Sequence, residues 1–187
     1  MELNRFILPL NVRAVVRDLG HLTQLFGLLM AAPLAVSLFS GEYACGLLFL
    51  LLAVAAFGLG KLAAMTTQAE SGLKEALVAT ALSYLLFALL AAAAFLPAMS
   101  IMDGFFEAIS GITTTGLTVV NPATLPEALL FFRCYLQWIG GAGIVVLSLC
   151  TLIGPGRNAF QLYTSEFGEE NLVGDVKATS RLVIKIY

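Results

Sequence analysis

Residues 103–118 read Asp-Gly-Phe-Phe-Glu-Ala-Ile-Ser-Gly-Ile-Thr-Thr-Thr-Gly-Leu-Thr. The first part, Asp103–Ile112, has helical periodicity, and Asp103 suits the N-cap or the first turn because an acidic group stabilises the positive start of a helix. A helix of about ten residues is only half as long as a bilayer crossing requires. Because this segment lies between two longer apolar runs, the sequence predicts a re-entrant helix.

The next six residues, Thr113–Thr118, predict a pore loop. Irregular backbone at membrane depth is tolerated only where protein buries it or where it lines a watery path. Its carbonyl oxygens can replace the hydration shell of a cation, and Gly116 allows backbone angles that other residues avoid. Taken alone the motif is weak, since threonine and glycine also cluster in ordinary turns. Its position after the short helix favours a pore loop.

Composition places the whole chain in a membrane. Of 187 residues, 59% are hydrophobic and 12% are charged, whereas soluble domains have roughly 45–50% apolar and about 25% charged residues. This excludes a disordered chain, a disulfide scaffold and an ordinary soluble enzyme, and no enzymatic activity or cofactor is expected. The net charge of −2 gives no bulk attraction to nucleic acid.

Four apolar runs are long enough to cross a bilayer of about 30 Å. The predicted fold is therefore an all-α integral membrane protein with four transmembrane helices plus one re-entrant pore helix and filter loop. Of the ten Lys and Arg residues, all except Arg133 fall on one side of this arrangement, which predicts cytoplasmic N- and C-termini. The four predicted spans are Leu19–Phe39, Ala44–Ala64, Ala76–Leu96 and Ala128–Ile153.

Two charged residues near the loop, Arg133 and Glu107, have two interpretations each. Arg133 is either an arginine that snorkels to the membrane surface or a group behind the filter that bonds loop carbonyls or an acid such as Glu107. Glu107 either faces an outer vestibule or pairs with Arg133. Gln137 lies one helical turn after Arg133 and can share its face. Close approach of another helix, or a bend, is allowed by Gly140, Gly141 and Gly143.

These residues resemble a known family. Residues 103–118 look like the first pore helix and filter of Trk/Ktr-type potassium transporters. The pattern R-x-x-x-Q-W-x-G-G-x-G-I at residues 133–144 resembles the helix that follows this filter and is highly specific. The resemblance covers roughly residues 72–187, although Thr164 and Ser165 stand where a basic residue is common. The first two spans resemble the extra helix pair of the Trk-type membrane subunit, which Ktr-type subunits usually lack.

The resemblance implies potassium uptake across the cytoplasmic (inner) membrane. Family members arrange four helix–loop–helix repeats around one pore, work as homodimers and are gated by a cytoplasmic nucleotide-binding regulatory subunit. Glycine at position 116 fits the potassium-selective members, and serine there accompanies sodium preference in some relatives. Arg133, Gln137 and Glu107 would support the filter, and Thr113 and Thr118 would flank it. The K⁺ ligands would be the backbone carbonyls of Thr114, Thr115, Gly116 and Leu117.

A fourfold filter needs four loops, and only one such loop is found in this sequence. The expected organisation is a two-helix hairpin over residues 1–71, the first repeat over 72–156, and a cytoplasmic linker with the start of the next repeat over 157–187, the chain being truncated there. Two alternatives stay open: a small cation channel that assembles from four copies, and a non-conducting membrane assembly subunit in which the loop is only a turn.

Overall fold

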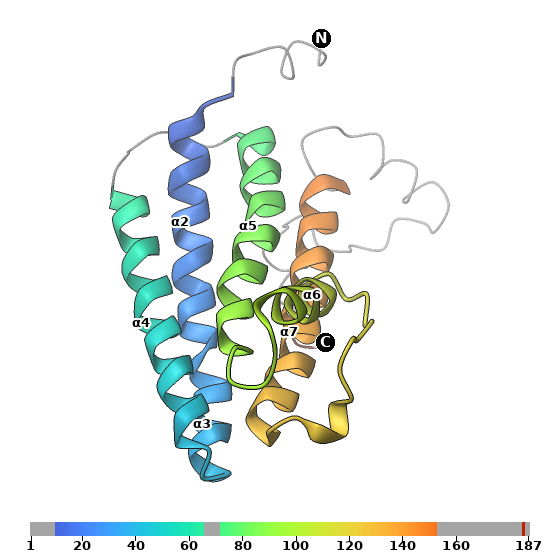
Figure 1. The fold of residues 1–187 in the computed structure, drawn as a ribbon. Coiled ribbons are helices and arrows are strands. Elements are labelled where there is room, and N and C mark those ends of the chain that lie inside the picture. The colour runs from blue at the N-terminus through green and yellow to red at the C-terminus, as the bar shows by residue number, and fades with distance from the viewer. Residues whose placement is uncertain (1–9, 66–71, 153–184, 186–187) are drawn as a thin grey trace. The chain divides into compact units, whose positions relative to one another are not determined.

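The computed structural model describes residues 10–65, 72–152 and 185, and every regular element within them is helical (Figure 1). The predicted linker at 157–187 lies outside this description apart from Lys185, and so does the predicted boundary at residue 71. The site described below lies wholly within residues 72–140.

The first predicted span forms two helices, α2 (Val12–Leu29) and α3 (Ala31–Phe39), which meet at Met30. The break follows from Pro33, which has no N–H to donate and whose ring would press on the carbonyl four residues earlier. The predicted start at Leu19 was wrong, because α2 begins already at Val12. The side chain of Asn11 caps it by accepting a hydrogen bond from the Ala14 amide at 3.4 Å.

Helix α4 (Tyr43–Met65) runs back along α2 in close backbone contact. A Cβ atom added to Gly20 would lie 2.7 Å from the Gly60 carbonyl oxygen, and one added to Gly60 would lie 2.6 Å from the Gly20 carbonyl oxygen. Glycine on both helices therefore allows an approach that a side chain would prevent, as small residues do in many membrane helix pairs.

Helix α5 (Leu73–Ala94) joins the same bundle. Its buried Glu75 accepts hydrogen bonds from the Asn11 amide at 3.3 Å and the Gly72 amide at 3.1 Å, which ties the starts of α2 and α5 together. At its other end, the ring of Phe95 packs on the ring of Phe132 of α7 (Glu127–Leu152), with 5.6 Å between the ring centroids. Thus α5 stands between the N-terminal hairpin and the elements of the predicted pore.

Three stretches among the described residues are long and apolar enough to cross a membrane, namely Val12–Phe39, Tyr43–Met65 and Lys74–Ala94. Helix α7 has 26 residues, more than the roughly 20 that a span requires, and its predicted end at Ile153 lies outside the description. The prediction of an all-α integral membrane protein is confirmed. The three span candidates overlap the first three predicted spans, and α7 lies where the fourth is predicted.

Candidate functional site: a short helix and a strained loop

The predicted short helix is present as α6 (Ile101–Ile112), with 12 residues. Its N-cap is Ser100, whose hydroxyl oxygen accepts a hydrogen bond from the Asp103 amide at 3.2 Å, and Asp103 lies in the first turn. Figure 1 views α6 along its axis while α5 runs up the page, so α6 lies across the bundle. Its re-entrant position in a bilayer stays a prediction.

Glycine residues allow α6 to pack closely against both α5 and α7. A Cβ on Gly104 would lie 3.1 Å from the Ala92 carbonyl oxygen of α5, and one on Gly111 would lie 3.2 Å from the Leu136 Cβ of α7. A side chain at Gly140 would collide with the carbonyl oxygen of Ile112, the last residue of α6. Close helix approach at Gly140, one of its two predicted roles, is confirmed.

The loop begins as a helix C-cap built from an unusual residue. The amides of Thr114 and Thr115 donate to the carbonyls of Gly111 (2.9 Å) and Ser110 (3.0 Å), which is the hydrogen-bond pattern of a Schellman motif. Glycine normally takes the left-handed position of this motif, but here Thr114 takes it with a φ of 59°. A β-branched residue in this conformation is rare and strained.

Gly116 is the second left-handed residue of the loop, with a φ of 79°. The sequence predicted unusual backbone angles there, and this is confirmed. It did not predict those of Thr114. With left-handed residues at two alternate positions, the loop lacks the strict alternation of carbonyl directions that a strand would have.

Arg133 and Glu107 form a buried ion pair behind the loop. The guanidinium Nε lies 2.6 Å from Glu107 Oε2, and the exposed fraction of the side chain is 10% for Arg133 and 0% for Glu107. A second guanidinium nitrogen, Nη2, donates to the carbonyls of Gly116 at 3.3 Å and Leu117 at 3.1 Å. The predicted bonds of Arg133 to loop carbonyls and to Glu107 are present, and its role behind a filter stays a prediction.

Glu107 also holds the far end of the loop. Its Oε1 accepts hydrogen bonds from the Thr118 hydroxyl at 2.6 Å and from the Val119 amide at 2.8 Å. Each carboxylate oxygen therefore has donors, and a buried charge with a partner and several hydrogen bonds is tolerable where an isolated one is not. Two roles were predicted for Glu107. The structure confirms the pairing with Arg133 and does not support the alternative, in which Glu107 faces an outer vestibule.

Two hydroxyl groups complete the attachment of the loop to α6. Ser110 donates to the Leu117 carbonyl at 2.6 Å. Thr113 donates to the Ile109 carbonyl at 2.6 Å and lies 2.8 Å from the Thr115 hydroxyl. Sequence reasoning missed Ser110, although a serine in the last turn of a helix before a loop is well placed for such a bond.

Gln137 of α7 reaches the loop as well. A Cβ placed on Gly116 would lie 3.9 Å from the Gln137 amide nitrogen, and no closer atom would surround it. The structure therefore brings together all nine predicted site residues on one loop and the two helices beside it, and the loop itself is exposed from Thr113 to Val119.

Comparison with known proteins decides the family of this helix–loop–helix unit. A family model described as TrkH, cation transport protein, matches residues 49–187, which is more than half of the chain and includes α6, the loop and α7. The chain belongs to the TrkH cation transport family. The predicted resemblance to the Trk branch is thereby confirmed.

Several TrkH-family relatives align with almost the whole chain. An uncharacterized cation transporter of Methanocaldococcus jannaschii is 33% identical over 95% of this chain and 38% of its own length. The Trk system potassium uptake protein TrkG of Escherichia coli K12 is 33% identical over 91% of this chain and 38% of its own length. The crystal structure of the potassium transporter TrkH from Vibrio parahaemolyticus superposes with a TM-score of 0.71 at 27% identity, covering 95% of this chain and 37% of that one.

The chain therefore spans a little over a third of the length of these TrkH-family relatives. The family consists of membrane transporters, and the helices of this chain make it a multi-pass membrane protein.

Proposed function

We propose that this chain supplies one of four pore loops of a protein that takes up potassium across the cytoplasmic membrane. The names of its relatives support potassium as the transported ion, since they include Trk system potassium uptake proteins of several bacteria. The remaining loops would come from further repeats of a longer chain, because the relatives are more than twice as long.

The observation that carries this proposal is the conformation of the loop. Backbone carbonyls select a cation by replacing its hydration shell, which requires several of them to face one path. The positive φ angles of Thr114 and Gly116 break the alternation of a strand, and this supports carbonyls that share a side. Strain of about 1–3 kcal/mol at such a residue persists only where the surroundings impose it, as functional sites do.

The four proposed ligand carbonyls differ in what else they bind. The Leu117 carbonyl already accepts hydrogen bonds from Ser110 and Arg133, so both of its lone pairs are used within this chain. The Gly116 carbonyl has one contact with Arg133 at 3.3 Å and keeps one lone pair for an ion. We therefore place the ion first against Thr114, Thr115 and Gly116, and Leu117 would join them only when one of its donors moves away.

Arg133, Glu107 and Gln137 are proposed to support the loop without binding the ion. A guanidinium repels a cation, and Arg133 lies on the protein side of the loop, where Glu107 neutralises it. Thr113 and Thr118 flank the ligands, and both have hydroxyl bonds that fix the ends of the loop. A backbone held at both ends keeps its carbonyls in place when the ion enters.

The wider assembly follows the family resemblance. We propose a cytoplasmic N-terminus, an N-terminal hairpin over residues 1–71, a first repeat over 72–156 and a following linker over 157–187. Lys and Arg residues gather on the side assigned to the cytoplasm, which supports this orientation. A homodimer gated by a cytoplasmic nucleotide-binding regulatory subunit is proposed on the resemblance alone.

Uptake of rubidium and sodium in a host that lacks its own potassium uptake tests the proposal. The full-length protein is expressed with Gly116→Ser, and Gly58→Ser serves as the control because Gly58 of α4 has open space around it. We expect Gly116→Ser to lower the preference for rubidium over sodium, since a side chain is strained at a φ of 79°. Unchanged uptake and selectivity in Gly116→Ser would contradict the filter assignment.

A further inference from the structure

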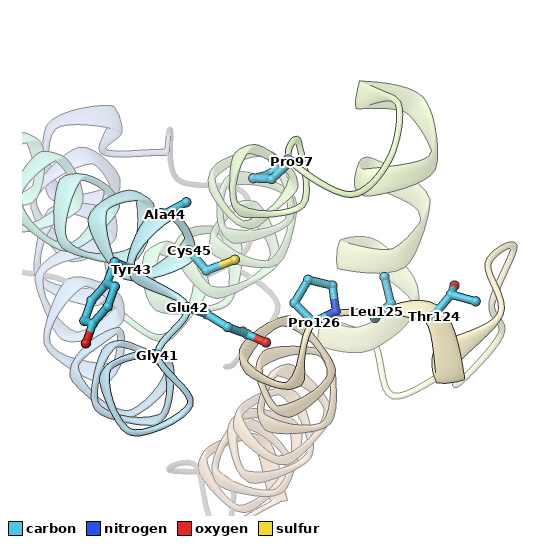
Figure 2. Close-up of a pocket in the computed structure, with 9 residues that line it drawn as sticks. All are labelled: Gly41, Glu42, Tyr43, Ala44, Cys45, Pro97, Thr124, Leu125 and Pro126. Atoms are coloured by element: carbon cyan, nitrogen blue, oxygen red, sulfur yellow. The ribbon is translucent and has the colours of Figure 1, made fainter.

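The turn between α3 and α4 reaches across to the start of α7. The carboxylate of Glu42 accepts hydrogen bonds from the amides of Glu127 at 2.8 Å and Ala128 at 3.0 Å, residues that lie about 85 positions further along the chain. The Ser40 hydroxyl adds a bond of 3.0 Å to the Glu127 side chain. Figure 2 shows Glu42 extending from the turn toward the chain at Pro126.

Helix α7 needs this contact because its own sequence gives it no cap. The first amides of a helix have no partner within the helix and carry its positive end. The residue before α7 is Pro126, whose side chain cannot accept a hydrogen bond. Glu42 therefore acts as an N-cap supplied by a distant segment, and its negative charge is favourable at this helix end.

The same helix holds the loop in place. Arg133 lies less than two turns after Ala128 and bonds the Gly116 and Leu117 carbonyls, and Gly140 seats the end of α6. A shift of the start of α7 along its axis would carry Arg133 with it. The position of the loop thus depends on the position at which α7 begins.

An open pocket lies beside this contact. It has a volume of about 710 Å³ and is lined by the turn at Gly41–Cys45, by Pro97 in the turn after α5, and by Thr124–Pro126 before α7 (Figure 2). On this open side, the two hydrogen bonds of Glu42 are the contacts that hold the turn to the backbone at the start of α7.

We propose that Glu42 is a positioning residue for the ion filter, through which the N-terminal hairpin fixes α7 and, by way of Arg133, the loop. This role rests on the proposed function, because it concerns the selectivity of the same loop. It gives the extra helix pair a task in ion selection besides anchoring the chain in the membrane.

The test uses the full-length protein in the uptake-deficient host, with the rubidium-to-sodium uptake ratio as the readout. A lost N-cap costs about 1 kcal/mol, a factor of about five in an equilibrium, so we expect Glu42→Ala to lower the ratio by up to about fivefold. Glu42→Gln keeps an acceptor oxygen and should have an intermediate ratio. The amount of folded protein in the membrane is measured in parallel.

The matched control is Glu127→Gln, which removes an equal charge next to Glu42 but leaves the backbone cap intact. We expect this variant to keep the normal ratio. A normal ratio in Glu42→Ala, or an equal loss in Glu127→Gln, would overturn the proposal. If Glu42→Ala does not accumulate in the membrane, the Glu42→Gln variant serves as the test. A normal rubidium-to-sodium ratio in Glu42→Gln would also overturn the proposal. An absence of rubidium uptake by the unmodified protein would instead contradict the proposed function.

Discussion

Breaking the buried ion pair between Arg133 and Glu107 should strongly lower the free energy of unfolding. Glu107→Gln keeps the shape of the side chain, and its amide oxygen can still accept from Thr118 and Val119. It leaves the Arg133 guanidinium, whose residue is 8% exposed, without its counter-charge. Removal of one partner of a buried pair costs about 3–5 kcal/mol, because the other charge stays buried.

The double variant Glu107→Gln with Arg133→Met separates stability from function. It removes both charges, so no uncompensated charge stays buried. We therefore expect the double variant to recover at least about 2 kcal/mol of the loss in Glu107→Gln. It should not recover selectivity, since the Gly116 and Leu117 carbonyls have lost their donor on α7.

The assay is reversible unfolding of the purified full-length protein in mixed micelles, titrated with a denaturing detergent, alongside rubidium and sodium uptake. Asp18→Asn is the control, because it changes the partly exposed pair of Arg17 and Asp18. A pair of this kind contributes about 0–1 kcal/mol to the free energy of unfolding. A loss below about 1 kcal/mol in Glu107→Gln, with no recovery in the double variant, would refute the account of the site.

Three further substitutions test separate parts of the site. Thr114→Gly removes the strain of a β-branched residue at a φ of 59°, so we expect a gain of about 1–2 kcal/mol in unfolding free energy together with weaker selectivity; a loss of stability would contradict this. Ser110→Ala removes the donor to the Leu117 carbonyl and should cost about 0.5–1.5 kcal/mol, measured by the same titration, with a lower rubidium-to-sodium ratio. Gly140→Leu should prevent normal accumulation of folded protein, since its side chain would meet the Ile112 carbonyl, whereas Gly58→Leu, in open space, should accumulate normally.

The parts of the fold that depend on local rules were predictable. The length of the apolar runs gave the membrane class, and the short run after Pro97 gave α6. Glycine at position 116 indicated unusual backbone angles because no other residue adopts them so freely. The pairing of Arg133 with Glu107 was one of two open alternatives, and burial decided it, since an unpaired charge at such a depth would be too costly.

Other parts depended on contacts between distant segments. The sequence analysis did not single out Glu42, because no local pattern connects it with Glu127, 85 positions away. The left-handed conformation of Thr114 was also not predictable, because the Schellman motif normally contains glycine at that position. The start of α2 was placed too late because its first turns contain Arg13, Arg17 and Asp18, which resemble a polar flank more than a helix.

The most direct measurement is a crystal structure of the full-length protein in rubidium, with the ions located by anomalous scattering. The account predicts rubidium in contact with the carbonyl oxygens of Thr114, Thr115 and Gly116, with Arg133 still bonded to Glu107 behind the loop. Rubidium bound elsewhere along the pore of a transport-competent protein, with none at this loop, would contradict it.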